Sequence, residues 1–227
     1  MQLKEYWAKA SQYGLTLPNI LSYLALKTME KWGRFSGTLA LKIKAALLGV
    51  ELGQDVQATG PIGILRHPAG KIRLGSHISL ISSWRRSTAA TLYAPTRFRV
   101  FGPNAVIEIG DYCELSGTSI SARSTTISLG RGCLIGPNCV ITDSDFHNHW
   151  PCEERSANPG YQHDARVQID DYVWIGMQTI ILKGVHIGRG AIIGARSVVT
   201  RDIPPMAVAC GAPAKTVNIH SDQSQTH

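Results

Sequence analysis

Branched aliphatic residues recur at every sixth position through the last part of this chain. The steps of six start at Ile169 and continue without a gap through Ile175, Ile181, Ile187, Ile193 and Val199. If about one residue in four were aliphatic, six such hits in succession would occur roughly once in four thousand starting positions. A period of six therefore organises this part of the chain, and it predicts a repeated unit of one short strand and one turn.

A second column of small or β-branched residues lies four positions after the first. Its members are Val173, Thr179, Val185, Ala191, Ser197 and Ile203. Both columns recur upstream, before and after a slip of two residues around 122–126, at Ile109, Leu115, Leu129, Ile135 and Ile141 and at Cys113, Ser119, Cys133 and Cys139. A lone six-residue unit cannot bury its aliphatic side chain, so three units must close a coil and the coils must stack. We therefore expect a mainly β protein with a parallel β-helix over residues 51–217, in which the three cysteines are small buried fillers.

Composition argues against several classes of protein. The 227 residues are 44% hydrophobic and 17% charged, which is typical neither of a disordered chain nor of a membrane-spanning one. No apolar stretch approaches the ~20 residues of a spanning helix, and the first residues lack the layout of a cleaved signal peptide. Five cysteines form an odd set without a CxxC motif, which favours a reducing compartment over a disulfide framework. We therefore expect a cytoplasmic location.

The first 50 residues form a basic segment that is expected to be helical. They contain seven Lys and Arg and two Asp and Glu, and the formal net charge of the whole chain is +7. Asn19 is expected to cap a helix that runs to residue 32, and Ser36 to cap a second helix that Gly49 ends. The second helix would carry on one face the apolar residues Leu39, Ile43, Ala46 and Leu47.

Two roles are open for residues 1–50. They could cap the first coil, or they could dock at an anionic membrane surface, which would place the protein at the inner face of the membrane. A nucleic-acid partner is not expected. At the other end of the chain, residues 218–227 are expected to form a polar tail.

One long insertion interrupts the repeat. From Ile141 the next aliphatic residue in phase is Ile169, which lies 28 residues further on instead of six. The inserted residues 143–166 are mostly polar and contain three histidines, His147, His149 and His163. A solenoid gains nothing from a polar excursion of this length, so such a loop is more often functional than structural.

A histidine in this loop is suited to acyl transfer. A neutral imidazole can take the proton of a hydroxyl or an amine while that group attacks an acyl carbon. Asp143, Asp145 or a backbone carbonyl could hold the ring in the required tautomer, and the sequence does not separate these three. A zinc site formed by His147, His149 and His163 is one alternative, and a solvated surface loop is another.

In four segments the chain resembles the hexapeptide-repeat acyltransferases. The segments are Asp171-Tyr-Val-Trp-Ile-Gly176, Ile181-Leu-Lys-Gly-Val-His-Ile-Gly188, Ile193-Gly-Ala-Arg-Ser-Val-Val-Thr-Arg-Asp-Ile-Pro-Pro205 and Gly211-Ala-Pro-Ala-Lys215. The most similar group contains galactoside, maltose and nodulation-factor acetyltransferases and polysaccharide O-acetyltransferases. Its polysaccharide branch is resembled by two further segments, Ser116-Gly-Thr-Ser-Ile-Ser-Ala122 and Ile141-Thr-Asp-Ser-Asp-Phe-His147. The resemblance spans residues 100–217. It implies a left-handed β-helix, a homotrimer with active sites between neighbouring subunits, and acetyl-CoA as the donor.

The resemblance also implies a role for His147, which matches the catalytic base of the family. Asn148 follows it where proline is common, so the path of the loop differs from the usual one. The acceptor is expected to lie against Ser116, Ser124, Trp174 and His149. No metal is expected.

Donor contacts follow from the same resemblance. Met177 matches the position whose backbone N–H faces the acyl carbonyl, and Ala195 matches a backbone contact to the pantetheine arm. Thr200, Arg201 and Lys215 match positions along the rest of the donor, where the two cations would bind its phosphates.

Together these features predict an acetyl-CoA-dependent O-acetyltransferase that acts on a hydroxyl of a sugar or polysaccharide precursor, with His147 as the general base. N-acetylation of an amino sugar is the nearest alternative, because the same base serves both reactions. A zinc-dependent carbonic anhydrase on the same solenoid and a non-enzymatic scaffold are the other two.

Overall fold

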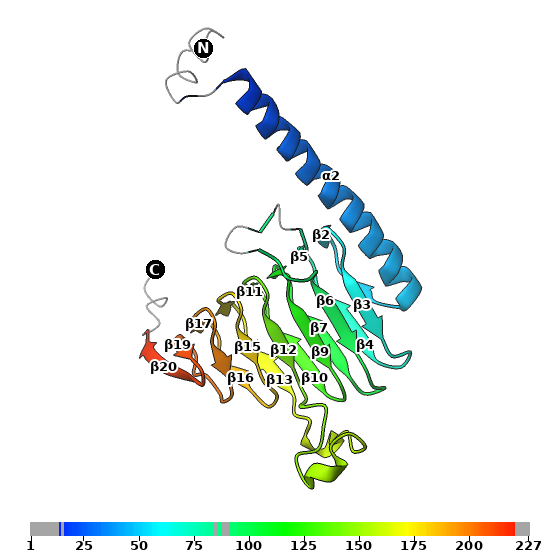
Figure 1. Ribbon diagram of the computed structural model, residues 1–227, viewed down its shortest axis with the longest axis vertical. Coiled ribbons are helices and arrows are strands. Elements are labelled where there is room, and N and C mark those ends of the chain that lie inside the picture. Colours follow the sequence, from blue (N-terminus) through cyan, green and yellow to red (C-terminus); the bar gives the residue numbers. More distant parts are fainter. Residues whose placement is uncertain (1–13, 15, 84–85, 88–90, 221–227) are drawn as a thin grey trace.

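Three parallel sheets form the sides of a left-handed β-helix, and one long helix precedes them (Figure 1). The computed structural model describes residues 14, 16–83, 86–87 and 91–220 of the chain. Within this part, the helix α2 (Leu17–Leu48) leads directly into the first coil of the solenoid. The fold class predicted from the six-residue period is therefore confirmed.

The strands of successive coils alternate among three sheets, which we name A, B and C. Sheet A contains β1 (Glu51–Leu52), β4 (Lys71–Leu74), β7 (Val106–Ile109), β10 (Thr126–Leu129), β13 (Val167–Ile169) and β16 (His186–Ile187). Sheet B contains β2 (Gln57–Thr59), β5 (Ser79–Ile81), β8 (Glu114–Ser116), β11 (Leu134–Ile135), β14 (Trp174–Ile175), β17 (Ile192–Ile193), β19 (Ala207–Gly211) and the antiparallel β20 (Ala214–Ile219). Sheet C contains β3 (Gly63–Arg66), β6 (Arg97–Val100), β9 (Ser119–Ala122), β12 (Val140–Thr142), β15 (Ile180–Ile181) and β18 (Val198–Val199).

Parallel pairing in register turns the sequence columns into columns of side chains. Gln168 pairs with His186 and Trp174 pairs with Ile192, in each case 18 residues further along the chain, which corresponds to three six-residue units. Equivalent residues of neighbouring coils therefore lie directly above one another, on the same side of the sheet.

The interior of the solenoid is filled by the predicted columns. From Ile169 to Val199, the aliphatic residues at steps of six are at most 1% exposed. The cysteines of the second column are buried beside them, as predicted. Burial raises the pKa of the Cys139 thiol to about 11. Because the thiolate is the reactive form of cysteine, Cys139 fills space in the core and is not a nucleophile.

The coils turn at corners, and two of these carry the candidate site. The B–C corner, between sheets B and C, contains residues 136–139, 176–179 and 194–197. The C–A corner, between sheets C and A, contains residues 123–125, 143–166, 182–185 and 200–202. We use these two names below.

Corner residues stack as regularly as the strands do. At the B–C corner, Gln178 N–H donates to the Pro137 carbonyl at 2.7 Å, and Arg196 N–H donates to the Met177 carbonyl at 2.8 Å. Asn138, Gln178 and Arg196 have φ angles between 59° and 62°. This left-handed conformation is what turns the chain through the corner.

The N-terminal segment forms one helix, so the prediction of two helices is wrong. Thr16 caps α2 and accepts the Asn19 N–H at 3.4 Å, and Gly49 ends the helix with a φ of 64°. Ser36, the expected second cap, lies inside the helix and donates its hydroxyl to the Trp32 carbonyl at 2.9 Å. A hydroxyl satisfied by the carbonyl four residues earlier is compatible with a helix interior.

The glycine beside Ser36 serves close packing rather than a break in the helix. A Cβ atom on Gly37 would lie 2.6 Å from the Ala58 carbonyl oxygen of β2. Gly37, Leu41 and Ala45 are the buried residues of α2, and they cover the first coil. The predicted apolar face points the other way and is exposed, with Leu39 at 50%.

The ends of the chain are only partly described. Residues 1–13 of the predicted basic segment and residues 221–227 of the predicted tail lie outside the described residues. Asn218 and Ile219 belong to β20 rather than to a tail. Among the described residues, no helix has the length and apolar character needed to cross a bilayer.

Candidate active site

The polar insertion has the bounds that the broken period predicts. It starts directly after β12 and ends directly before β13, so it comprises residues 143–166. It contains two short 3₁₀ turns, η1 (Cys152–Glu154) and η2 (Tyr161–His163). In Figure 1 it projects from the C–A corner as the yellow-green segment at the bottom of the view. Because β13 resumes pairing with β10, the solenoid continues unchanged beyond it.

A buried ion pair ties the insertion to the solenoid. The side chains of Arg123 and Asp164 are 6% and 1% exposed. Arg123 Nε lies 2.8 Å from Asp164 Oδ2, and Nη2 lies 2.5 Å from Oδ1. Burial on its own would raise the pKa of Asp164, but hydrogen bonds from Arg123 and Ser124 outweigh it and hold the pKa below its usual value. The sequence pattern did not single out this pair.

A second buried carboxylate shapes the corner where the insertion starts. Asp143 is fully buried and accepts the backbone N–H groups of Arg123 at 2.7 Å, Ser124 at 3.2 Å and Thr125 at 2.8 Å. These three residues account for the slip of two in the six-residue period. All the hydrogen bonds of Asp143 go to the corner and none to His147, so the prediction that it orients His147 is wrong.

His147 is held by a backbone carbonyl. Its Nδ1 lies 2.9 Å from the carbonyl oxygen of Arg155. A carbonyl can only accept, so Nδ1 carries the proton in this hydrogen bond and Nε2 is left with a free lone pair. His147 is exposed, and its Nε2 is therefore available as a base. Of the three orienting groups left open by the sequence, the carbonyl is the one observed.

Asp145, the other predicted orienter, binds different partners. Its Oδ2 lies 2.6 Å from His149 Nε2 and 2.6 Å from Lys183 Nζ. Burial would raise the pKa of Asp145, but these two partners together lower it. Asp145 therefore links the insertion to the next coil, and the prediction that it orients His147 is wrong. His149 also stacks on His163, with ring centres 5.3 Å apart.

The backbone around His147 is unusual. Phe146 has a φ of 65°, an uncommon value for a bulky residue, and such outliers cluster at functional sites. Asn148 donates its backbone N–H to the Asn158 carbonyl at 2.9 Å, a bond that proline could not make. A Cβ atom on Gly160 would lie 2.9 Å from the Asn148 Cα atom. The asparagine that replaces the common proline thus joins the two halves of the insertion.

Two backbone amides at the B–C corner have no partner. Among the described residues, no hydrogen bond is formed by the N–H of Met177 or by the N–H of Ala195. At corners between sheets A and B, the corresponding amides of Ser76 and Arg131 donate to aspartate side chains at 2.7 Å. The pair at the B–C corner lies in consecutive coils, so two N–H donors are available to a ligand.

The remaining predicted donor contacts are divided between two corners. Thr200 and Arg201 follow β18 at the C–A corner, and both are exposed. Lys215 lies on β20, whose hairpin with β19 turns beside the B–C corner, where Gly211 N–H donates to Ser197 Oγ at 3.1 Å. Sheet C lies between the two groups, and His147 belongs to the C–A side.

The predicted acceptor residues are also divided. Ser116 and Trp174 line one cavity of about 300 Å³ on sheet B, together with Arg86, Glu114 and Pro137. Trp174 is 53% exposed there. Ser124 lies instead at the C–A corner, and its hydroxyl donates to Asp164. Ser124 and His149 thus lie on the side of His147, whereas Ser116 and Trp174 lie beside the free amides.

A further segment, which the sequence pattern did not reveal, covers the B–C corner. Between β5 and β6 the chain makes a longer connection, of which residues 82–83, 86–87 and 91–96 are described. Tyr93 N–H donates to Asn138 Oδ1 at 2.9 Å, and Gln178 Nε2 donates to the Tyr93 hydroxyl at 2.5 Å. Gln178 is adjacent to Met177, so Tyr93 forms a wall beside the free amides. The ragged period before Ile109 was the only sequence signal of this segment.

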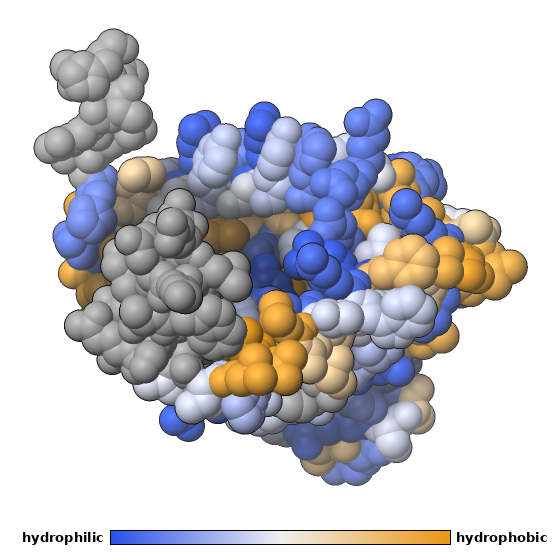
Figure 2. Space-filling view, turned by 90° about the horizontal axis from the view of Figure 1, so that it is seen from above, coloured by the Kyte–Doolittle hydropathy of each residue, from blue (hydrophilic) through white to orange (hydrophobic). Residues whose placement is uncertain are grey.

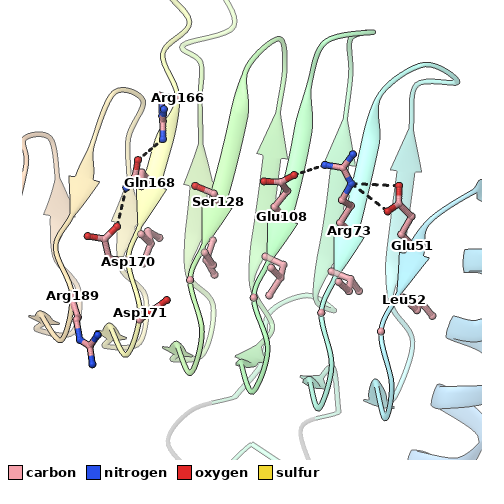
Figure 3. Close-up of a pocket in the computed structure, with 18 residues that line it drawn as sticks. Glu51, Leu52, Arg73, Glu108, Ser128, Arg166, Gln168, Asp170, Asp171 and Arg189 are labelled. Atoms are coloured by element: carbon pink, nitrogen blue, oxygen red, sulfur yellow. Dashed lines mark hydrogen bonds and ion pairs between the residues drawn. The ribbon is translucent and has the colours of Figure 1, made fainter.

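The largest groove lies elsewhere, on the outer face of sheet A (Figure 3). It has a volume of about 880 Å³, and none of the predicted site residues lines it. Its charged side chains are already paired, since Arg73 binds Glu51 and Glu108, and Asp170 lies 2.9 Å from His186 Nε2. These pairs connect neighbouring coils, and we assign no chemistry to the groove.

The insertion histidines do not converge on a common point. The rings of His149 and His163 are stacked with an angle of 4° between their planes, and His147 points to the Arg155 carbonyl. Within the described part of the chain, no group of three His, Cys, Asp or Glu side chains is arranged to hold a metal ion.

Comparison with known proteins identifies the repeat. Residues 166–201 match the family model described as bacterial transferase hexapeptide (six repeats). A putative acetyltransferase of Schizosaccharomyces pombe is 41% identical over 91 residues, which are 40% of this chain and 42% of that protein. The galactoside O-acetyltransferase of Lactococcus lactis is 37% identical over 112 residues, 49% of this chain and 51% of that protein. The chain thus spans about half the length of these relatives.

Solved structures share the fold over more of the chain. A polysialic acid O-acetyltransferase superposes with a TM-score of 0.58 at 21% identity and covers 78% of each chain. A galactoside acetyltransferase, solved in complex with coenzyme A, has a TM-score of 0.50 at 23% identity and covers 90% of this chain and 83% of that one. The resemblance to hexapeptide-repeat acyltransferases is confirmed, and these relatives and neighbours are acetyltransferases.

Proposed function

We propose that this chain, which carries the bacterial transferase hexapeptide repeat, is an acetyl-CoA-dependent O-acetyltransferase that acts on a hydroxyl of a sugar or polysaccharide precursor. The observation that carries the proposal is the hydrogen bond from His147 Nδ1 to the Arg155 carbonyl, which leaves Nε2 unprotonated. An exposed imidazole held in that tautomer is the base that an attacking hydroxyl requires.

The reaction follows from this tautomer. His147 Nε2 accepts the proton of the acceptor hydroxyl while the oxygen attacks the thioester carbonyl carbon. The bond from carbon to oxygen forms, and the bond from carbon to sulfur then breaks. The imidazolium of His147 returns its proton to the departing thiolate, so the base is regenerated. Acetyl-CoA supplies the acetyl group as an activated thioester.

The B–C corner fits the donor. The unpartnered N–H groups of Met177 and Ala195 can donate to a carbonyl oxygen and to an amide of the pantetheine arm. A backbone N–H aimed at the thioester oxygen stabilises the negative charge that develops there, and such a donor contributes a factor of about 10²–10³ to the rate. Arg201 and Lys215 are exposed cations suited to the phosphates of the donor.

The site requires a second copy of the chain. His147 extends from the C–A corner, whereas the free amides of Met177 and Ala195 lie at the B–C corner, with sheet C between them. A neighbouring subunit that brings its B–C corner to the insertion of the first would complete the site. Three such contacts related by a threefold axis close into a homotrimer.

The side chains on the outer face of sheet C support this arrangement. In the last coils its outward positions are Val140 and Ile180, each 37% exposed, and the half-buried Val198. The equivalent positions on sheet A are Ser128, Gln168 and His186, all polar. An apolar column between the two half-sites is typical of a surface that packs against another subunit.

A thiol-release assay with acetyl-CoA and a panel of sugars tests the proposal. We expect release with a hydroxyl acceptor, and loss of that release in His147→Ala. His186→Ala is the matched control, because it removes an exposed histidine from sheet A. Full activity of His147→Ala would refute the base. Release with amino sugars alone would change the reaction to N-acetylation.

A further inference from the structure

Helix α2 exposes a continuous apolar stripe. The residues of the stripe are between 50% and 79% exposed, and they are Leu17, Leu21, Leu24, Trp32, Phe35, Leu39, Ile43 and Leu47. At 3.6 residues per turn these positions fall on one side of the helix, over a length of about 45 Å. A stripe of this length on a helix surface has no structural explanation within one chain and marks an interaction surface.

The stripe lies opposite the face that packs on the solenoid. The buried residues of α2 are Gly37, Leu41 and Ala45, all in its C-terminal part. Residues 17–29 include no buried position, so the first half of α2 extends beyond the first coil (Figure 1). One face of the helix is therefore used for folding, and the other is left for a partner.

Cations without ion pairs border the stripe. Lys31, Arg34 and Lys42 form no salt bridge with any described residue, and together they line a cavity of about 470 Å³ between α2 and the first coil. Phe35 and Leu39 of the stripe line the same cavity. Viewed from above, orange apolar residues and blue polar residues lie side by side on this part of the surface (Figure 2).

The cavity carries a net positive charge. Asp55 is its one acidic lining residue, and its carboxylate already accepts Gln57 Nε2 at 2.8 Å and lies 3.4 Å from His77 Nδ1. Three cations thus surround a space that opens beside an apolar surface. The chemistry of that space fits a phosphate group attached to a hydrocarbon chain.

The charge of α2 argues against a second copy as the occupant of the stripe. The helix contains five Lys and Arg and one acidic residue, Glu30, which is paired with Lys27 at 2.9 Å. Two copies facing each other through this surface would bring like charges together. An anionic surface is complementary to the same set, and aromatic residues such as Trp32 and Phe35 suit a lipid–water interface.

We propose that the outer face of α2 is a docking surface for a bilayer that contains anionic phospholipid. The apolar stripe enters the boundary between headgroups and acyl chains, and the cavity of Lys31, Arg34 and Lys42 receives a phosphate headgroup. The solenoid then stands on the membrane through its first coil. This inference does not depend on the acetyl-transfer reaction, and its test needs no activity assay.

Co-sedimentation of the full chain with vesicles tests the proposal. We expect binding to phosphatidylcholine vesicles that contain phosphatidylglycerol, weaker binding to phosphatidylcholine alone, and a decrease with added salt. The triple variant K31Q/R34Q/K42Q should bind on the order of 100-fold more weakly, because each cation near an anionic surface contributes a factor of about 5. The control K71Q/R99Q/R131Q removes the same charge from the coils and should bind as the wild type does.

Substitutions in the stripe separate the bilayer from the alternatives. Phe35→Ser with Leu39→Ser should weaken vesicle binding and leave the molecular mass in solution unchanged, with circular dichroism to verify the fold. A change of mass without a change in vesicle binding would assign the stripe to a second copy and overturn the proposal. Equal binding of wild type and K31Q/R34Q/K42Q would also overturn it, as would protection by inorganic phosphate without any binding to vesicles.

Discussion

The imidazole Nδ1 of His147 lies 2.9 Å from the carbonyl oxygen of Arg155. A main-chain group therefore sets the tautomer of the proposed base, and no side chain is required for this purpose. The Arg155 side chain donates its Nε to the His149 carbonyl at 3.2 Å, so Arg155 joins the two histidines without placing a charge on His147.

The first prediction separates the base from its carboxylate neighbour. His147→Ala should lower kcat/KM by about 10²–10⁴-fold, the usual contribution of a general base. Asp145→Asn should lower it far less, because Asp145 contacts His149 and Lys183 rather than His147. Steady-state kinetics of both variants would check this. A loss in Asp145→Asn as large as in His147→Ala would assign the orienting role to the carboxylate.

The second prediction concerns the buried pair of Arg123 and Asp164. Removing one partner leaves an uncompensated charge in the protein interior, so Arg123→Met should lower the free energy of unfolding by about 3–5 kcal/mol. The exposed Arg131→Met is the control and should change it by less than about 1 kcal/mol. Chemical denaturation gives both values. Equal stability of the two variants would contradict the structural role of the pair.

The third prediction is a pH dependence with a definite sign. The pKa of Asp164 in the folded protein lies below its value of about 3.9 in an unfolded chain. The carboxylate thus stabilises the fold fully above about pH 5, and this contribution is lost as the pH falls through the folded pKa. The difference in Tm between the wild type and Asp164→Asn should therefore be largest near neutral pH and shrink below about pH 4. A difference that grows on acidification would contradict the assignment.

The fourth prediction tests the free amide of Met177. Pro137 occupies the same corner position one coil earlier, because Leu134 pairs with Trp174 and Val140 pairs with Ile180. A proline is thus compatible with this corner, and Met177→Pro should fold while it removes the N–H. We expect kcat/KM to fall by about 10²–10³-fold.

A packing precedent and a control support the design of this variant. Gly188 already packs under Pro205, and the spacing there is similar to that between Gly136 and Met177. A Cβ atom on Gly188 would lie 2.5 Å from the Pro205 nitrogen, and one on Gly136 would lie 2.7 Å from the Met177 nitrogen. Met177→Ala keeps the N–H and should retain nearly full activity. Unchanged kinetics in a folded Met177→Pro would exclude a role for the amide.

The fold was predictable because the six-residue period is a direct image of the core. Ile169 and Ile175 point inward for the same reason that they are six residues apart, so the pattern and the buried column are one property. The helix was less predictable. Ser36 and Gly37 have the composition of a break, and only the close approach of Gly37 to the Ala58 carbonyl explains why the helix continues.

The site was predictable in its residues but not in its contacts. The insertion identified His147, yet a hydrogen bond to a backbone carbonyl leaves no trace in the identity of the residue that provides it. Asp143 and Asp145 were the natural partners by proximity in sequence, and the structure directs them to the corner and to Lys183 instead. Arg123 and Asp164 lie 41 residues apart, and no local pattern connects them.

The register of β13 on β10 has a consequence for how such proteins diverge. Val167 pairs with Ile127 as though residues 143–166 were absent, so the ladder places no demand on the length of what is inserted there. Scaffold and recognition element are separable modules. Grafting another loop between Thr142 and Val167 would therefore exchange the chemistry offered to an acceptor while the framework beneath it stays the same.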